Sequence, residues 1–189
     1  LRENISLKNL TNLEHVPGVL YFCDTVTLPD NLYKNETKLE LHYEEVIDIT
    51  MALARDQWVD KVQTVLDKLP NLGVLEGFPS LRRACNGKKT INLNKHTKLR
   101  MVPGYMHLNP NFILPKSVYK ATTSINLDHI EIDTDDQTKF QQITTELGKY
   151  TNLRTLDDGL FSSAIRKYLD ANPKSILDLS NYPNLEKVP

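Results

Sequence analysis

Ile91-Asn-Leu93, followed by Leu99-Arg-Met-Val102-Pro103, is one of three copies of the same pattern in this chain. Each copy has an alternating apolar pair, a polar stretch and the sequence Leu-x-x-Val-Pro. Neighbouring copies lie 86 residues apart, and a fixed period is typical of a repeat architecture. The other two copies are Ile5-Ser-Leu7 with Leu13-Glu-His-Val16-Pro17 and Leu177-Asp-Leu179 with Leu185-Glu-Lys-Val188-Pro189.

The same period of 86 residues extends beyond this pattern. Leu28-Pro29 matches Leu114-Pro115, and Tyr33 matches Tyr119 at the same offset. We therefore expect a single repeat domain over residues 1–189, with long units at about 5–90 and 91–176 and the start of a third at 177–189. Because the chain begins with Leu1 rather than Met and closes within a third copy, we expect a fragment of a longer protein.

Composition limits the class of protein. The 189 residues include 23 basic and 24 acidic side chains, so no overall charge attracts the chain to nucleic acid or to an anionic membrane. A hydrophobic content of 40% is that of a globular protein. No apolar run approaches the roughly 20 residues that a membrane-spanning helix requires. We predict no membrane span and no nucleic-acid partner, and favour an intracellular over a secreted location.

Short segments of the form apolar-x-apolar predict half-buried β-strands, because strand side chains alternate between the two faces of a sheet. Two further strands are predicted at Asn71-Leu72-Gly-Val-Leu75 and Asn152-Leu153-Arg-Thr-Leu156, where the apolar residues are spaced differently. The alternating segments are Ile5-Ser-Leu7, Leu39-Glu-Leu41, Ile91-Asn-Leu93, Ile125-Asn-Leu127 and Leu177-Asp-Leu179.

Amphipathic helices are predicted between these strands. From Ile49 to Leu69 apolar residues recur at three- and four-residue spacing. A shorter counterpart is predicted at about Asp136 to Tyr150, with acidic residues near its start. A third helix is predicted at about Ser162 to Ala171. Trp58, the single tryptophan, falls among the apolar positions of the first helix, so we expect it in the core.

Three segments resemble the leucine-rich-repeat pattern L-x-x-L-x-L-x-x-N/C-x-L. They are Leu39-Glu-Leu41 with Val46, Ile125-Asn-Leu127 with Ile130 and Ile132, and Asn152-Leu153-Arg-Thr-Leu156-Asp-Asp-Gly-Leu160. The chain is similar to the irregular leucine-rich arrays of F-box substrate receptors and of bacterial or parasite effectors. The resemblance implies an α/β fold, a leucine-rich-repeat-like solenoid with a parallel sheet on one face and helices on the other.

The strand register has an alternative. Strands that begin instead at Leu13, Leu99 and Leu185 would continue through the Leu-x-x-Val-Pro sequences. We favour the first register, because Pro17 and Pro103 have no amide hydrogen to donate to a sheet.

The middle side chain of each apolar-x-apolar segment is expected to point away from the core. In a stacked array these residues and their neighbours would form one continuous face, hydrophilic and mildly acidic, which suits the binding of another protein or a peptide. The residues predicted for this face are Ser6, Lys8, Glu40, His42, Asn92, Asn94, Asn126, Asp128, Asp178 and Ser180.

A second candidate site is basic. Arg82, Arg83, Lys88 and Lys89 surround Asn86-Gly87, and such a group can bind a phosphate or an acidic partner. A charged turn between repeats explains the same group equally well.

Motifs of catalysis are missing from the sequence. There is no phosphate-binding glycine loop, no G-x-S-x-G, no H-E-x-x-H and no paired C-x-x-C. The five histidines are scattered and are expected as surface or rim side chains. Acids between Asp128 and Asp136 are expected to serve a helix start rather than calcium. Cys23 and Cys85 could pair once, although a buried free thiol is more common.

The sequence therefore predicts a protein that is not an enzyme and needs no metal or cofactor. We expect a protein-recognition module with a concave sheet surface, such as the substrate receptor of a ubiquitin ligase or an effector. The alternative is a scaffold within an enzyme or a nucleic-acid-binding assembly whose active region lies outside this chain.

Overall fold

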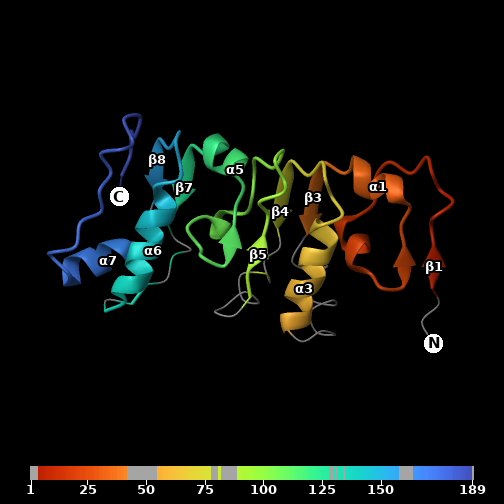
Figure 1. Cartoon of the computed structure of the whole chain (residues 1–189), viewed down its shortest axis with the longest axis horizontal. Helices are drawn as coiled ribbons and strands as arrows, with labels where there is room; N and C mark the ends of the chain where they lie inside the picture. The colour runs from red at the N-terminus through yellow and green to blue at the C-terminus, as the bar shows by residue number, and fades with distance from the viewer. Residues whose placement is uncertain are drawn as a thin grey trace.

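A computed structural model describes residues 4–41, 55–77, 81, 89–127, 130, 132–133, 135–157 and 164–188. The elements follow one another along the longest axis of the molecule, from β1 near the N-terminus to α7 near the C-terminus (Figure 1). Neighbours in sequence are therefore mostly neighbours in space.

The strands are short, and each is paired with one other strand. Every pair is parallel, which requires a crossover connection between its two members. The pairs are β1 (Ile5–Ser6) with β2 (Val26–Thr27), β3 (Lys38–Leu41) with β4 (Val74–Gly77), β5 (Ile91–Asn92) with β6 (Phe112–Ile113), and β7 (Ser124–Asn126) with β8 (Thr155–Asp157).

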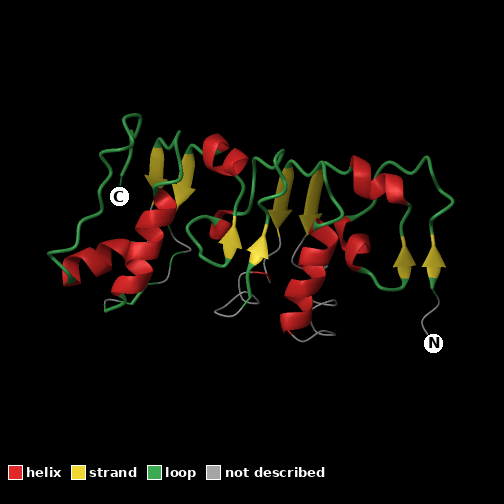
Figure 2. Cartoon of the chain, in the orientation of Figure 1, coloured by secondary structure: helices red, strands yellow, loops and turns green. Residues whose placement is uncertain are grey.

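The expected solenoid with one parallel sheet is wrong. Within the described residues the strands form four separate two-stranded sheets in a mixed α/β structure. Figure 2 shows the arrows of β3, β4, β7 and β8 pointing one way and those of the β1/β2 and β5/β6 pairs pointing the other way. Single-residue bridges join Val74 to Met101 and Thr155 to Lys187. Pro103 follows the first bridge closely and has no amide hydrogen with which to extend it.

Most of the predicted strands are present. Six of the seven predicted segments contain a strand. These strands include Ile5, Leu39, Leu75, Ile91, Ile125 and Leu156. The segment 177–179 is not a strand, which corrects that prediction. The bridges at Met101 and Lys187 lie within the second and third Leu-x-x-Val-Pro sequences. The alternative register, with strands that begin at Leu99 and Leu185, is therefore present as one paired residue in each of these copies.

Two helices form the crossovers of the longer strand pairs. Helix α3 (Arg55–Leu66) connects β3 to β4, and α6 (Gln137–Leu147) connects β7 to β8. Helix α7 (Ala164–Ala171) follows β8. The three predicted helices are confirmed within the described residues, and the predicted starts at 49–54 and 162–163 lie outside them. Asp136 caps α6 by accepting a hydrogen bond of 2.8 Å from the amide of Lys139.

Short helical turns that the sequence did not predict recur at the period of 86 residues. Helices α1 (Asp30–Asn35) and α5 (Lys116–Ala121) each follow a Leu-Pro pair. Proline suits a position just before or at a helix start, because its fixed φ is helical and its missing amide hydrogen is not needed there. The 3₁₀ turns η1 (Gly18–Phe22) and η2 (Gly104–Met106) follow Pro17 and Pro103 in the same way.

The core lies between the strands and the helices. Leu39, Leu41 and Leu75 point inward from β3 and β4 and are at most 1% exposed. Trp58 of α3 is also 1% exposed and contacts the ring of Phe22 at a centroid distance of 5.3 Å. The predicted burial of Trp58 is confirmed. Burial of side chains of this size contributes roughly 1.5–3 kcal/mol each, which makes this layer a main source of stability.

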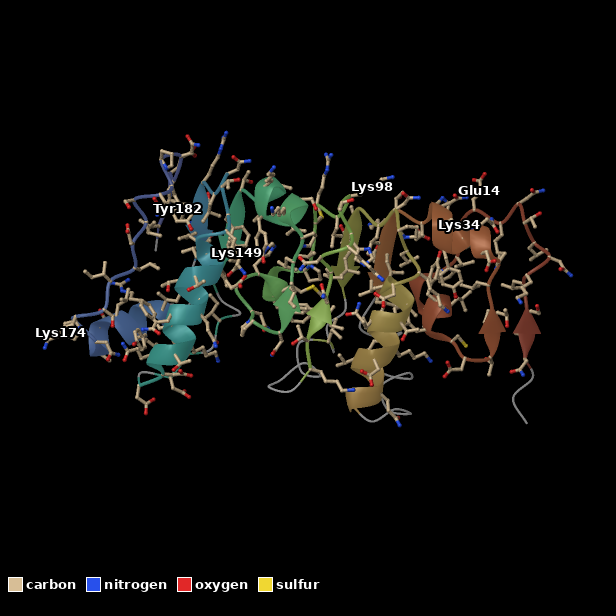
Figure 3. The ribbon with its side chains drawn as sticks, in the orientation of Figure 1. Glu14, Lys34, Lys98, Lys149, Lys174 and Tyr182 are labelled. Carbon is tan, nitrogen blue, oxygen red and sulfur yellow. The ribbon has the colours of Figure 1, made fainter. Side chains whose placement is uncertain are left out.

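Asparagine side chains tie each crossover to the preceding short helix. Asn71 donates a hydrogen bond of 2.6 Å to the carbonyl of Lys34, at the end of α1. Asn152 donates one of 2.7 Å to the carbonyl of Lys120, at the end of α5. Lys98 donates to Asn71 in turn, at 2.6 Å, and Figure 3 shows Lys34 and Lys98 toward the same edge of the molecule. These bonds satisfy helix-end carbonyls that lack partners within the helix.

Candidate functional site

The ten residues predicted for a binding face do not form one row. Glu40 lies on β3 and Asn126 on β7, whereas Ser6 of β1 and Asn92 of β5 belong to sheets that point the opposite way (Figure 2). The continuous face is therefore divided among separate sheets and loops. Lys8, Asn94 and Ser180 lie in exposed turns, Asp178 lies in an exposed segment without strand structure, and His42 and Asp128 lie outside the described residues.

Charged side chains gather on the pair of β3 and β4. Glu40 lies directly opposite Glu76 in the strand register, where two like charges repel each other. Lys38 offsets this repulsion through ion pairs of 3.0 Å with Glu40 and 2.8 Å with Glu76. These hydrogen bonds, the one with Glu76 first, raise the pKa of Lys38, which stays charged. We call Lys38, Glu40 and Glu76 the charged cluster; it is partly exposed and carries a net negative charge.

The pair of β7 and β8 has a related but weaker arrangement. Asn126 lies opposite Asp157 in the register, so an amide replaces one of the two carboxylates. Lys187 reaches Asp157 from the segment bridged to β8, with an ion pair of 3.1 Å. This second group has no net charge, and the charged cluster of β3 and β4 is the stronger candidate for recognition.

A cavity of about 380 Å³ lies beside β3. Its walls are formed by residues 15–18, Tyr21 and residues 36–40. Gly18 is needed for this geometry, because a Cβ atom at this position would come 1.9 Å from the carbonyl oxygen of Glu40. The missing side chain lets the start of η1 approach β3 closely at the cavity wall.

Glu36 reaches this cavity and is only 7% exposed. Its Oε2 accepts a hydrogen bond of 2.7 Å from the hydroxyl of Tyr21, and its Oε1 accepts one of 3.3 Å from the amide of Lys38. Burial, followed by the hydrogen bond and the charge of Glu36, raises the pKa of Tyr21 far above its usual range. Tyr21 is therefore a neutral donor, and it holds the carboxylate in a fixed orientation at the cavity wall.

The predicted basic site has one described member. Lys89 forms an ion pair of 2.5 Å with Asp60 of α3. Arg82, Arg83 and Lys88 lie outside the described residues. Lys89 is therefore paired with a carboxylate of its own chain. The anion-binding site at Arg82, Arg83, Lys88 and Lys89 stays a prediction.

One histidine expected at the surface or rim lies in the core. His96 is 1% exposed, and its Nδ1 lies 3.2 Å from the carbonyl oxygen of Leu69. His107 is partly buried, with Nδ1 2.9 Å from the hydroxyl of Tyr150. Burial lowers the pKa of both imidazoles, that of His107 to about 4. Of the residues that match His96 at the period of 86, Tyr182 is also buried, whereas Leu10 is exposed.

Comparisons with protein-family models, curated proteins and solved structures find no match to this chain. The resemblance to leucine-rich repeats thus stays a prediction from the sequence. The site must be interpreted from its own chemistry.

The groups that the site presents are two carboxylates, one ammonium and the lining of the cavity. Among the described residues, no group of three His, Cys, Asp or Glu side chains is placed to hold a metal ion. Cys23 is a free thiol 3.2 Å from the hydroxyl of Thr25, and Cys85 lies outside the described part of the chain. The helices that the structure describes are too short or too polar to cross a bilayer. The charged cluster and the adjoining cavity offer ion pairing and hydrogen bonding to a partner.

Proposed function

We propose that this protein is a non-catalytic recognition module that binds another protein or a peptide through β3 and β4. The observation that carries this proposal is the charged cluster, in which two carboxylates share one ammonium beside a cavity. The side chains of Lys38, Glu40 and Glu76 are 48%, 39% and 36% exposed, so a partner can reach them. Their net negative charge favours a partner with basic side chains.

Stability alone is a weak reason for such a cluster. Exposed ion pairs contribute about 0–1 kcal/mol, because water screens the charges and ordering long side chains costs entropy. A like-charge pair directly across two strands is unfavourable before Lys38 is added. Complementary charge is more effective in selecting a partner and in accelerating association than in holding a fold together.

The narrower role stays a prediction. A substrate receptor of a ubiquitin ligase and an effector both bind other proteins, and the sequence resemblance suggested each of them. Neither role follows from the charged cluster, which indicates only the charge of the partner.

A selection experiment tests the proposal without a known partner. The purified chain is immobilised, and random peptides displayed on phage are selected against it. Enriched peptides are then synthesised, and their affinities are measured by biolayer interferometry for the wild type and for the double variant Glu40→Lys with Glu76→Lys. We expect peptides rich in Arg and Lys, and a loss of affinity of about tenfold or more in the double variant.

A charge-matched control separates the cluster from overall charge. Asp133 and Asp170 are exposed acids away from β3 and β4, and Asp133→Lys with Asp170→Lys makes the same change in net charge. Binding by the control variant should match the wild type. Peptides that bind the cluster variant and the wild type equally well would overturn the proposal.

The scaffold alternative has a distinct signature. Affinity for DNA or RNA that falls steeply with salt, and that disappears on charge reversal at Arg82, Arg83, Lys88 and Lys89, would favour a nucleic-acid assembly. Turnover of a small molecule by the purified chain would contradict the non-catalytic proposal directly.

A further inference from the structure

The cavity beside β3 is lined by the buried carboxylate of Glu36. Among the described residues, no ion pair joins Glu36 to a basic side chain; its two hydrogen bonds come from a hydroxyl and a backbone amide. Lys38 also lines the cavity, but its ammonium is engaged by Glu40 and Glu76. The negative charge of Glu36 is therefore not neutralised by this lysine.

The matching position in the second long unit carries no carboxylate. Thr122 stands 86 residues further along, at the end of α5, where Glu36 follows α1. The hydroxyl of Thr122 donates a hydrogen bond of 2.9 Å to the carbonyl of Val118 in its own helix, and the position matching Tyr21 is His107, which contacts Tyr150 instead. A buried charge costs free energy unless it is paired. The two hydrogen bonds to Glu36 explain a buried acceptor but do not neutralise its charge, which can therefore pair with a cation from outside the chain.

We propose that the cavity receives an arginine side chain of the protein partner, with Glu36 as the anion that pairs with it. This inference rests on the proposed function, and it specifies which chemical group the partner contributes. A cavity of about 380 Å³ is large enough for one such side chain. Val16, Pro17 and Leu39 provide apolar wall for the methylene stem.

Arginine fits better than lysine for two reasons. Its guanidinium is planar and carries five donors, so it can serve Glu36 and still donate to other acceptors in the cavity wall. It is also more weakly hydrated than an ammonium, and its removal from water into a buried site costs less. The titratable groups that line the cavity with Glu36 are His15, Tyr21, Lys38 and Glu40.

Small ligands test the cavity without any selected peptide. The full chain is labelled with ¹⁵N and titrated with N-acetyl-arginine amide and with N-acetyl-citrulline amide, which has nearly the same shape but no charge. The backbone amide of Lys38 is the reporter, because it donates to Glu36 Oε1. We expect a saturable shift of this resonance with the arginine compound and about tenfold or weaker binding of the citrulline compound.

Substitution of the carboxylate tests its role. Glu36→Gln keeps an acceptor for Tyr21 but removes the charge, and it should abolish the preference for arginine over citrulline. Glu186→Gln, at an exposed position outside the cavity, should leave the preference unchanged. If Glu36→Gln does not fold, the wild type alone tests the inference. Its affinity for the arginine compound should exceed that for the citrulline compound, and this ratio should fall as salt is added. No shift at Lys38, equal binding of both ligands, or a preference that survives in Glu36→Gln would overturn the inference.

The experiments distinguish an error in the arginine site from an error in the proposed recognition function. Selected peptides that depend on the charged cluster while N-acetyl-arginine amide fails to bind would overturn the arginine site and leave the recognition function standing. The opposite result is that the arginine compound binds at Glu36 but no selected peptide depends on the charged cluster. That result would contradict the proposed function and leave the cavity as a small-molecule pocket.

Discussion

Acid should destabilise this protein through the histidine beside α6. His107 Nδ1 lies 2.9 Å from the hydroxyl of Tyr150, and burial raises the pKa of that tyrosine so that it keeps its proton. In the His107 tautomer with its proton on Nε2, Nδ1 accepts from the Tyr150 hydroxyl. Protonation of His107 would remove this acceptor and place a charge in a poorly hydrated position. Burial lowers the pKa of His107 from 6.5 to about 4.

The sign and size of the effect follow from this pKa. The unfolded chain binds the proton at a higher pH than the native chain does, so stability is complete above about pH 6.5 and declines as the pH falls through the folded-state pKa of about 4. One pKa unit corresponds to about 1.4 kcal/mol, which gives a loss of up to about 3 kcal/mol near pH 4. His96 is shifted in the same direction, mainly by burial, and adds to the loss.

Urea unfolding followed by the fluorescence of Trp58 measures this dependence. Between about pH 7.5 and about pH 4.5, His107→Gln should lose about 2–3 kcal/mol less unfolding free energy than the wild type, because glutamine accepts from Tyr150 but does not titrate in this range. His15→Gln, at an exposed position, should follow the wild-type curve. The reasoning is refuted if His107→Gln loses stability with acid as steeply as the wild type.

Three substitutions test the fold itself. Leu75→Ala should lower the free energy of unfolding by about 2–5 kcal/mol, since this side chain is 0% exposed in the core; a loss below about 1 kcal/mol in urea would contradict its packing. Asp136→Ala should cost about 1 kcal/mol by removing the cap of α6, and unchanged thermal unfolding would argue against that cap. Gly18→Ala should cost about 1–3 kcal/mol because its Cβ would meet the Glu40 carbonyl, and full retention of stability would mean that the segment does not approach β3 so closely.

Local structure could be predicted from the sequence because it depends on local patterns. Alternation marked β3 and β7, helical spacing marked α3 and α6, and apolar context placed Trp58 in the core. Period-matched positions, such as the helix starts at Asp30 and Lys116, also share their conformation.

The arrangement of the sheets could not be predicted in the same way. Alternation shows that a strand has an inner and an outer face, but it gives no direction relative to the next strand pair. The assumption of one parallel sheet therefore placed Ser6 and Asn126 in one row, whereas their sheets point in opposite directions (Figure 2). The cavity was missed for a related reason, because Tyr21 and Glu36 are 15 residues apart and meet only in the folded chain.

Hydrogen–deuterium exchange of the full chain, with and without a selected peptide, tests the central claim most directly. The proposal that β3 and β4 form the recognition surface predicts slower exchange on binding in residues 36–41 and 74–77, and in residues 15–18 where the cavity adjoins them. Exchange in α7 should not change. Protection confined to α7 or to the pair of β7 and β8, with none at β3 and β4, would contradict the proposed recognition surface.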